Sequence, residues 1–351
     1  MNKYTEKGSF ISKQEAIMLQ AVAVMLMVWH HLFGFPDRIT EPFVLILDAI
    51  YPVETYLAYF GRVCISIFAF SSGYGLRKKH LITANGIGIL QNYQSMFTRL
   101  LKFFSRYWAV FFVFVPIGFA LRLYSFNWKS FLGGIIGNGS GYNGEWWYVG
   151  YYVRYLLLFP LLNVWMEFLG RISRIAPHVF TAACVILLTI VPSSMSMYSF
   201  LTVLICFWEG MYFVNSKIFE CVFNHLPKKE WIRSGLGIGL FCVAFLMRHT
   251  GIPDYWLVAP LVFAVMLLLK ANNSNRFLHP PLIFIGQYST YIWLTHTFFA
   301  YYFFQKLTFL PQYSWLIFIW CLTLCVLSAM VLENVLLYIC KPKKKYAPTK
   351  H

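Results

Sequence analysis

Five ionisable side chains lie inside or at the edge of long apolar runs of this sequence, where charge is costly in a bilayer. They are His31, Arg62, Glu145, Arg154 and His296. A neutral imidazole can remove a proton from a hydroxyl near neutral pH, and a neighbouring carboxylate can orient that imidazole. An arginine can hold an anionic substrate group or stabilise a developing oxyanion. Together these residue types point to proton transfer from a hydroxyl group.

The same residues also have a structural interpretation, because polar side chains that pair with one another hold helices together in a membrane. His30 is interpreted in this way, as a packing or interface residue. The small residues in 71–75 are expected mainly to permit close helix contact. The glycine-rich segment 137–144 is either a connector or a gate for substrate. The sequence leaves these interpretations open.

Composition places the chain among membrane proteins. Of its 351 residues, 59% are hydrophobic and only 12% are charged, whereas soluble domains carry about 25% charged residues. The fold class expected is an all-α, polytopic bundle forming one domain over residues 1–351, with no soluble domain. The net charge is +16, but the basic residues lie between apolar runs and not on one face of a folded domain. This distribution excludes nucleic-acid binding.

A membrane-spanning helix needs roughly 20 apolar residues. Ten such spans are predicted, together with a small interfacial helix. The spans are 16–35, 55–76, 103–123, 146–169, 178–193, 197–215, 234–249, 255–271, 282–305 and 313–340, and the interfacial helix is 43–51.

Positive charge predicts the orientation of the bundle. With a cytosolic N-terminus, 22 of the 29 Lys and Arg residues fall in cytosolic segments and 5 fall in outer ones. Because cytosolic loops are enriched in Lys and Arg, both termini are expected in the cytosol. Residues 1–15 then form a cytosolic segment without a cleaved signal peptide, and 341–351 form a basic tail suited to anionic membrane lipids.

The cysteines predict no metal centre. Most of the eight lie in apolar runs, and no CxxC pair occurs. Neither disulfides nor a zinc site is expected.

Depth in the membrane brings several polar residues together. Gln20 lies near the cytosolic end of the first span, and eleven residues at ~1.5 Å each place His31 about 16 Å further out. The direction of each span then puts all five ionisable residues named above in the outer half of the bundle. We expect His31 and Glu145 to face one cavity that opens to the outer side.

Four segments follow one another along the chain in a distinctive order: 20–31, 61–74, 146–162 and 286–296. With these segments the sequence resembles the membrane acyltransferase-3 family, which O-acylates cell-surface glycans. In that family's first helix a basic residue precedes a His by eleven positions, and a Phe-rich stretch then ends in Ser-Gly-Phe/Tyr. A Trp-Phe/Tyr helix follows, and a late helix carries Ser-x-x-Ile-Tyr-Leu-x-His.

The resemblance implies a donor, an acceptor and a base. The donor would be a cytosolic acyl-CoA, and we expect acetyl-CoA. It would act as a co-substrate, and no bound cofactor is expected. The acceptor would be a hydroxyl of an extracytoplasmic glycan or lipid-linked glycan, at the plasma membrane of a bacterium. His31 would be the general base and Glu145 its partner.

Further residues are implied in binding the substrates. They are Gln20, Arg62, Arg154, His296 and Ser72. Gln20 departs from the family's basic residue, so Arg62 or Lys13 would supply the charge, or the donor is held differently. Cys64 and Ser72 are conceivable acyl carriers.

Two other functions fit the same features. Ten spans with buried polar groups also suit a transporter or exporter of a glycan or lipid-linked precursor. A non-catalytic assembly or sensor protein would explain the uncharged Gln20.

Overall fold

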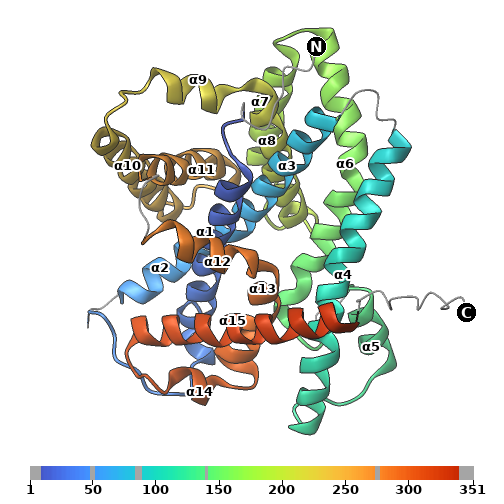
Figure 1. Ribbon diagram of the computed structural model, residues 1–351, viewed down its shortest axis with the longest axis vertical. Helices are drawn as coiled ribbons and strands as arrows, with labels where there is room; N and C mark the ends of the chain where they lie inside the picture. Colours follow the sequence, from blue (N-terminus) through green and yellow to red (C-terminus); the bar gives the residue numbers. More distant parts are fainter. Residues whose placement is uncertain (1–8, 48–51, 84–88, 139–140, 273–276, 340–351) are drawn as a thin grey trace, which may run out of the picture.

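The computed structural model describes residues 9–47, 52–83, 89–138, 141–272 and 277–339, and it consists of packed α-helices (Figure 1). Within these ranges the only β-type pairing is a parallel bridge between Val44 and Tyr313. The prediction of an all-α bundle is confirmed. The helices are α1 (Lys13–Phe33), α2 (Val53–Gly61), α3 (Cys64–Thr83), α4 (Ile89–Ala120), α5 (Trp128–Ile135), α6 (Trp147–Ile172), α7 (Ala176–Ile190), α8 (Tyr198–Ser216), α9 (Ile218–His225), α10 (Glu230–His249), α11 (Asp254–Ala271), α12 (His279–Gln287), α13 (Ser289–Thr297), α14 (Gln305–Phe309) and α15 (Ser314–Ile339).

In the described part of the chain, seven helical segments are long and apolar enough to cross a membrane. Each of them corresponds to one predicted span, and one of them joins α2 to α3 across a break at Arg62. Their bounds are Lys13–Phe33, Val53–Ile82, Gln91–Ala120, Gly144–Ile172, Glu230–His249, Asp254–Ala271 and Ser314–Ile339.

The other three predicted spans take different forms. The run 178–193 forms α7, which has only 15 residues, and the run 197–215 forms α8. The run 282–305 is not one helix. It is divided into α12, α13 and a π-helical turn, Phe298–Tyr302, before α14 begins.

The prediction of an interfacial helix at 43–51 is wrong for residues 43–47, which are the part that the structure describes. This stretch is not helical, because the backbone at Val44 pairs with the segment before α15. The Val44 amide donates to the Gln312 carbonyl at 2.7 Å, and the Ser314 amide donates to the Val44 carbonyl at 3.1 Å. Residues 48–51 lie outside the described residues.

Helix α1 is the centre of the bundle. A capping box starts it: the Glu15 amide donates to the Ser12 hydroxyl, and the Glu15 carboxylate accepts from the Ser12 amide. It packs against α2, α3, α12 and α13, so that Leu19, Ala23 and Val28 have no exposed surface. Its last turn, which carries His31, therefore ends inside the protein.

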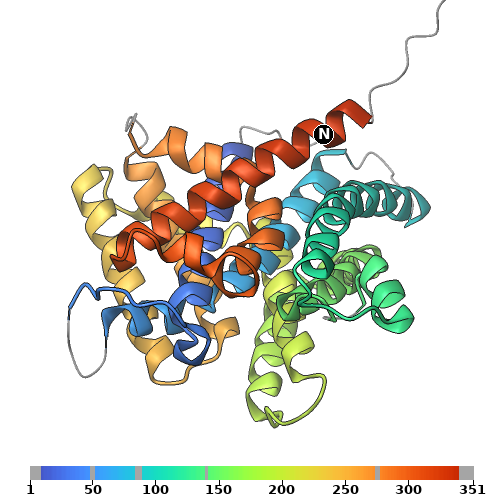
Figure 2. The same ribbon diagram turned by 90° about the horizontal axis from the view of Figure 1, so that it is seen from below.

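The other helices surround α1. Helices α4 and α6 lie together on one side of the bundle, and α10 and α11 lie together on the opposite side (Figures 1 and 2). Helix α15 runs across the bundle and packs on α13 and α4. Several of these helices begin or end close to the end of α1.

Helices α3 and α8 approach closely through a pair of glycines. A Cβ added to Gly73 would collide with the Phe207 carbonyl oxygen, and one added to Gly210 would collide with the Phe70 carbonyl oxygen. The segment 71–75 thus provides the close helix contact expected from its small residues.

We predict that Gly210→Ala lowers the midpoint of thermal unfolding by several degrees, because overpacking typically costs about 1–3 kcal/mol. Gly75→Ala on α3 is the matched control, since no atom lies within 4 Å of its added Cβ. Unfolding is measured by intrinsic fluorescence in detergent. Equal midpoints for the two variants would contradict the proposed backbone contact.

Candidate active site

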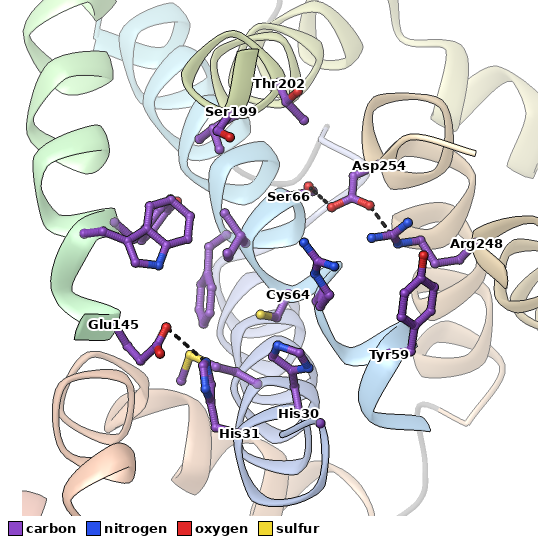
Figure 3. Close-up of a pocket in the computed structure, with 18 of the residues that line it drawn as sticks. His30, His31, Tyr59, Cys64, Ser66, Glu145, Ser199, Thr202, Arg248 and Asp254 are labelled. Atoms are coloured by element: carbon purple, nitrogen blue, oxygen red, sulfur yellow. Dashed lines mark hydrogen bonds and ion pairs between the residues drawn. The ribbon is translucent and has the colours of Figure 1, made fainter. Parts of the chain in front are cut away.

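A cavity of about 660 Å³ lies at the end of α1 (Figure 3). Its walls come from the end of α1, the α2–α3 break, the start of α6, the start of α8, the α10–α11 turn and α13. Its polar lining residues include His30, His31, Thr55, Tyr59, Arg62, Cys64, Ser66, Glu145, Ser199, Thr202, Arg248, Asp254 and His296.

The side chains of His31 and Glu145 face each other across one end of this cavity (Figure 3). The His31 Nε2 atom lies 3.9 Å from Glu145 Oε2, and the side chains are 10% and 17% exposed. This separation allows electrostatic attraction but exceeds a hydrogen bond. Catalytic contacts are often long without substrate and shorten when it binds. The structure thus brings together the two residues that the sequence placed at similar depth.

Three groups hold the Glu145 carboxylate and the backbone beneath it. Arg38 Nη1 lies 3.2 Å from Glu145 Oε1, and the Tyr301 hydroxyl donates to the same oxygen at 3.0 Å. The Glu145 amide donates to the Asn143 side-chain oxygen at 3.0 Å. Glu145 also lies two residues before α6 begins, where a helix N-terminus favours negative charge.

His296 lies beside His31, with 4.8 Å between the ring centroids. Its Nδ1 faces the carbonyl oxygens of Ile292 and Trp293 at 3.1 and 2.8 Å, so Nδ1 carries the proton and Nε2 has the free lone pair. Neither His296 Nε2 nor His31 Nδ1 has a hydrogen-bond partner within the described residues, and both atoms are buried.

The tautomer of His31 follows from its neighbours in the same way. The carboxylate beside Nε2 favours a proton on that nitrogen, which leaves Nδ1 as the basic atom. His31 lines the cavity, and a neutral imidazole there can accept a proton from a bound hydroxyl. His31 is therefore arranged as a general base whose orienting carboxylate is Glu145.

A second polar cluster lies in the cavity away from His31 (Figure 3). Asp254 Oδ1 lies 3.0 Å from Arg248 Nε, and the Ser66 hydroxyl donates to Asp254 Oδ2 at 3.1 Å. The Arg248 guanidinium lies 4.9 Å from the centre of the Tyr59 ring. Since this cluster combines a charge pair, a hydroxyl and an aromatic face, it is suited to binding a polar ligand.

Three of the residues expected at the site lie elsewhere. Arg154 is exposed on α6, with its guanidinium 5.8 Å from the Tyr151 ring centre and 5.9 Å from that of Phe200. Ser72 is buried on α3, and Gln20 is half-buried in the middle of α1. None of the three lines the cavity. Of the two conceivable acyl carriers, only Cys64 reaches the cavity.

The described residues contain no group of three or more His, Cys, Asp and Glu side chains that could hold a metal ion. The seven cysteines that the structure describes are free thiols.

Comparison with known proteins identifies the chemical class. Residues 15–334 match the model of the acyltransferase 3 family, which is described as an acyltransferase domain. This match covers nearly the whole chain. The chain belongs to the acyltransferase 3 family. No curated protein and no solved structure matched the chain in the same comparisons. Together with its apolar helices, membership of this family makes the protein a membrane acyltransferase.

Some residues of this acyltransferase site were not expected from the sequence. Arg38 was counted only as an outer charge, and Tyr301 was one of many aromatic residues in an apolar run. Arg248 and Asp254 flank a short turn between two helices. The only signal for this pair was two opposite charges six residues apart, which many unrelated turns share.

The hydrogen bond from Tyr301 to the Glu145 carboxylate can be tested by removing the Tyr301 hydroxyl. We predict that Tyr301→Phe lowers acyl transfer roughly tenfold, because a hydrogen bond to a charged acceptor contributes about 1.5–3 kcal/mol. Tyr313→Phe is the control, since Tyr313 is half exposed and lies outside the cavity. Transfer is measured in membranes that contain equal amounts of each variant. Equal activity of the Tyr301 variant and the wild type would show that this hydrogen bond does not support the site.

Proposed function

We propose that this membrane acyltransferase transfers an acyl group from cytosolic acyl-CoA to a hydroxyl of an extracytoplasmic glycan. The acyl group that we expect is acetyl. The observation that carries the proposal is the His31–Glu145 pair at 3.9 Å inside a cavity of a membrane acyltransferase. Acyl transfer to a hydroxyl requires a base that removes its proton, and His31 is the buried imidazole held beside a carboxylate.

The transfer then combines removal of a proton from the acceptor with attack on the thioester. The acceptor hydroxyl gives its proton to the His31 imidazole as its oxygen bonds to the thioester carbonyl carbon. The C–S bond breaks, and the CoA sulfur leaves with the proton returned from His31. Glu145 stabilises the imidazolium that forms between these steps. If the acyl group first passes to a carrier on the protein, His31 has the same role toward the acceptor.

The sides of the membrane are assigned by charge. The excess of Lys and Arg in segments 77–106 and 217–233 supports a cytosolic position for these segments. The end of α1 at His31 then faces the outer half of the membrane, and its start at Lys13 faces the cytosol. In this orientation, in a bacterial plasma membrane, donor and acceptor approach the cavity from opposite sides.

Replacing the base tests the proposal directly. We predict that His31→Ala lowers the acyl ester content of the surface glycan at least about 100-fold, the lower limit for general base catalysis, while the glycan is still exported. Mass spectrometry of the surface glycan measures both quantities. His225→Ala is the control, because His225 is exposed on α9 and its Nδ1 contacts the carbonyl oxygen and the sulfur of Cys221, one turn earlier on the same helix.

The opposite pattern would contradict the enzyme assignment. A His31→Ala strain that exports little glycan, but keeps normal ester content on what it exports, would support the transporter or exporter.

The uncharged residue in the middle of α1 gives a second prediction. The resemblance described above implies a basic residue at the position of Gln20, and this side chain is half-buried. We therefore expect Gln20→Lys to keep or raise acyl transfer. Gln14→Lys, on the exposed first turn of α1, controls for added charge. Complete loss of activity in Gln20→Lys alone would show that the donor site has adapted to a neutral group.

A further inference from the structure

The two carboxylates that line the cavity each have a guanidinium partner. Glu145 is paired with Arg38 at 3.2 Å, and Asp254 is paired with Arg248 at 3.0 Å. Each pair is close to neutral, so neither leaves charge available to attract a charged ligand. The net charge of the cavity wall is therefore set by any further ionised side chain that lines it.

Arg62 is that further group. It lines the cavity and is exposed, and no carboxylate among the described residues lies within 4.0 Å of it. Arginine stays protonated in proteins. The cavity thus carries one positive charge that the protein itself does not neutralise.

The position of Arg62 is fixed by contacts with the helix that carries the base. Arg62 follows the last turn of α2, in which the Ala58 carbonyl contacts His30 Nδ1 at 2.7 Å. A Cβ added to Gly61 would lie 3.0 Å from His30 Cβ, so the backbone just before Arg62 is pressed against α1. The backbone of Arg62 therefore lies next to the turn of α1 that contains His31.

We propose that Arg62 binds a carboxylate or phosphate group of the acceptor, which makes the acceptor an acidic glycan and not a neutral one. This inference rests on the function proposed above. The planar guanidinium can donate two parallel hydrogen bonds to such a group, which gives orientation as well as attraction. An acidic substituent held there positions a hydroxyl of the same or the adjoining sugar toward His31.

Other lining residues of the same cavity suit the rest of a sugar. Ser199 and Thr202 line it from α8, and Thr55 lines it from α2. These hydroxyls can both donate and accept hydrogen bonds with sugar hydroxyls. Trp147 and Tyr59 contribute aromatic surface to the same cavity.

The donor is the other possible source of an anion, because acyl-CoA carries phosphates. Positive charge along the chain supports an outer position for the α2–α3 break and a cytosolic approach for the donor. An anion that reaches Arg62 from outside belongs to the acceptor. The two sources can be separated experimentally.

The test measures binding by calorimetry to the full-length protein in detergent micelles. The probes are cellobiouronic acid with its neutral counterpart cellobiose, and glucose 6-phosphate with glucose. The wild type is expected to bind the better acidic probe at least roughly tenfold more tightly than its neutral counterpart. Arg62→Gln should remove this preference, and Arg62→Lys should keep part of it. Arg171→Gln, an exposed arginine at the end of α6, should leave it unchanged.

Three results would overturn the inference. They are no preference of the wild type for either acidic probe, a preference that persists in Arg62→Gln, and a loss in Arg62→Gln that concerns the donor alone. The third is detected by comparing acetyl-CoA with S-acetylpantetheine, which lacks the nucleotide phosphates. Because none of these measurements requires turnover, failure of the inference is distinct from failure of acyl transfer, which the glycan ester content records.

Discussion

The ionised carboxylate of Glu145 is the group on which the arrangement of the cavity depends. A buried charge without partners is costly in a protein interior, so a folded chain must bring donors to it. Arg38 and Tyr301 come from segments more than 250 residues apart, and both reach the same oxygen atom of Glu145. The charge therefore ties the loop after α1 and the turn after α13 to the start of α6. His31 is placed against that carboxylate by the same arrangement.

The interrupted segment after α12 explains how an apolar run can contribute to this site. A straight helix over 282–305 would direct its side chains along fixed stripes. The π-helical turn at Phe298–Tyr302 changes the direction of the chain, and turns of this type are frequent at functional sites. Here it lets Tyr301 reach Glu145 while the Tyr302 hydroxyl accepts from the Gly144 amide at 2.9 Å. The cavity is thus built where regular helices end, and α1 supplies the rigid element beneath it.

Much of this arrangement follows from the sequence because membranes impose simple rules. Helix length and hydropathy predicted the bundle, and depth alone grouped His31, Arg62, Glu145 and His296, which all line one cavity. Depth does not specify the direction that a side chain takes around the helix axis. Arg154 was expected at the site on the basis of depth, but it points out of the bundle.

Other features could not be predicted because they depend on tertiary contacts. The break in 282–305 occurs in a run as apolar and aromatic as a regular span, so hydropathy does not reveal it. The non-helical chain at Val44 is set by pairing with a segment that is distant in the sequence. The partners of Glu145 and Asp254 likewise become visible only when loops and helix ends are brought together.

The central claim is that an imidazole near the outer side removes a proton while a thioester reaches it from the cytosol. The most direct test is an experimental structure of the protein bound to a non-reactive thioether analogue of acyl-CoA. The account predicts that the nucleotide lies on the cytosolic side and that the acyl end contacts His31 in the cavity. An analogue bound with its acyl end away from His31, in a protein with no passage between that ring and the cytosolic side, would contradict it.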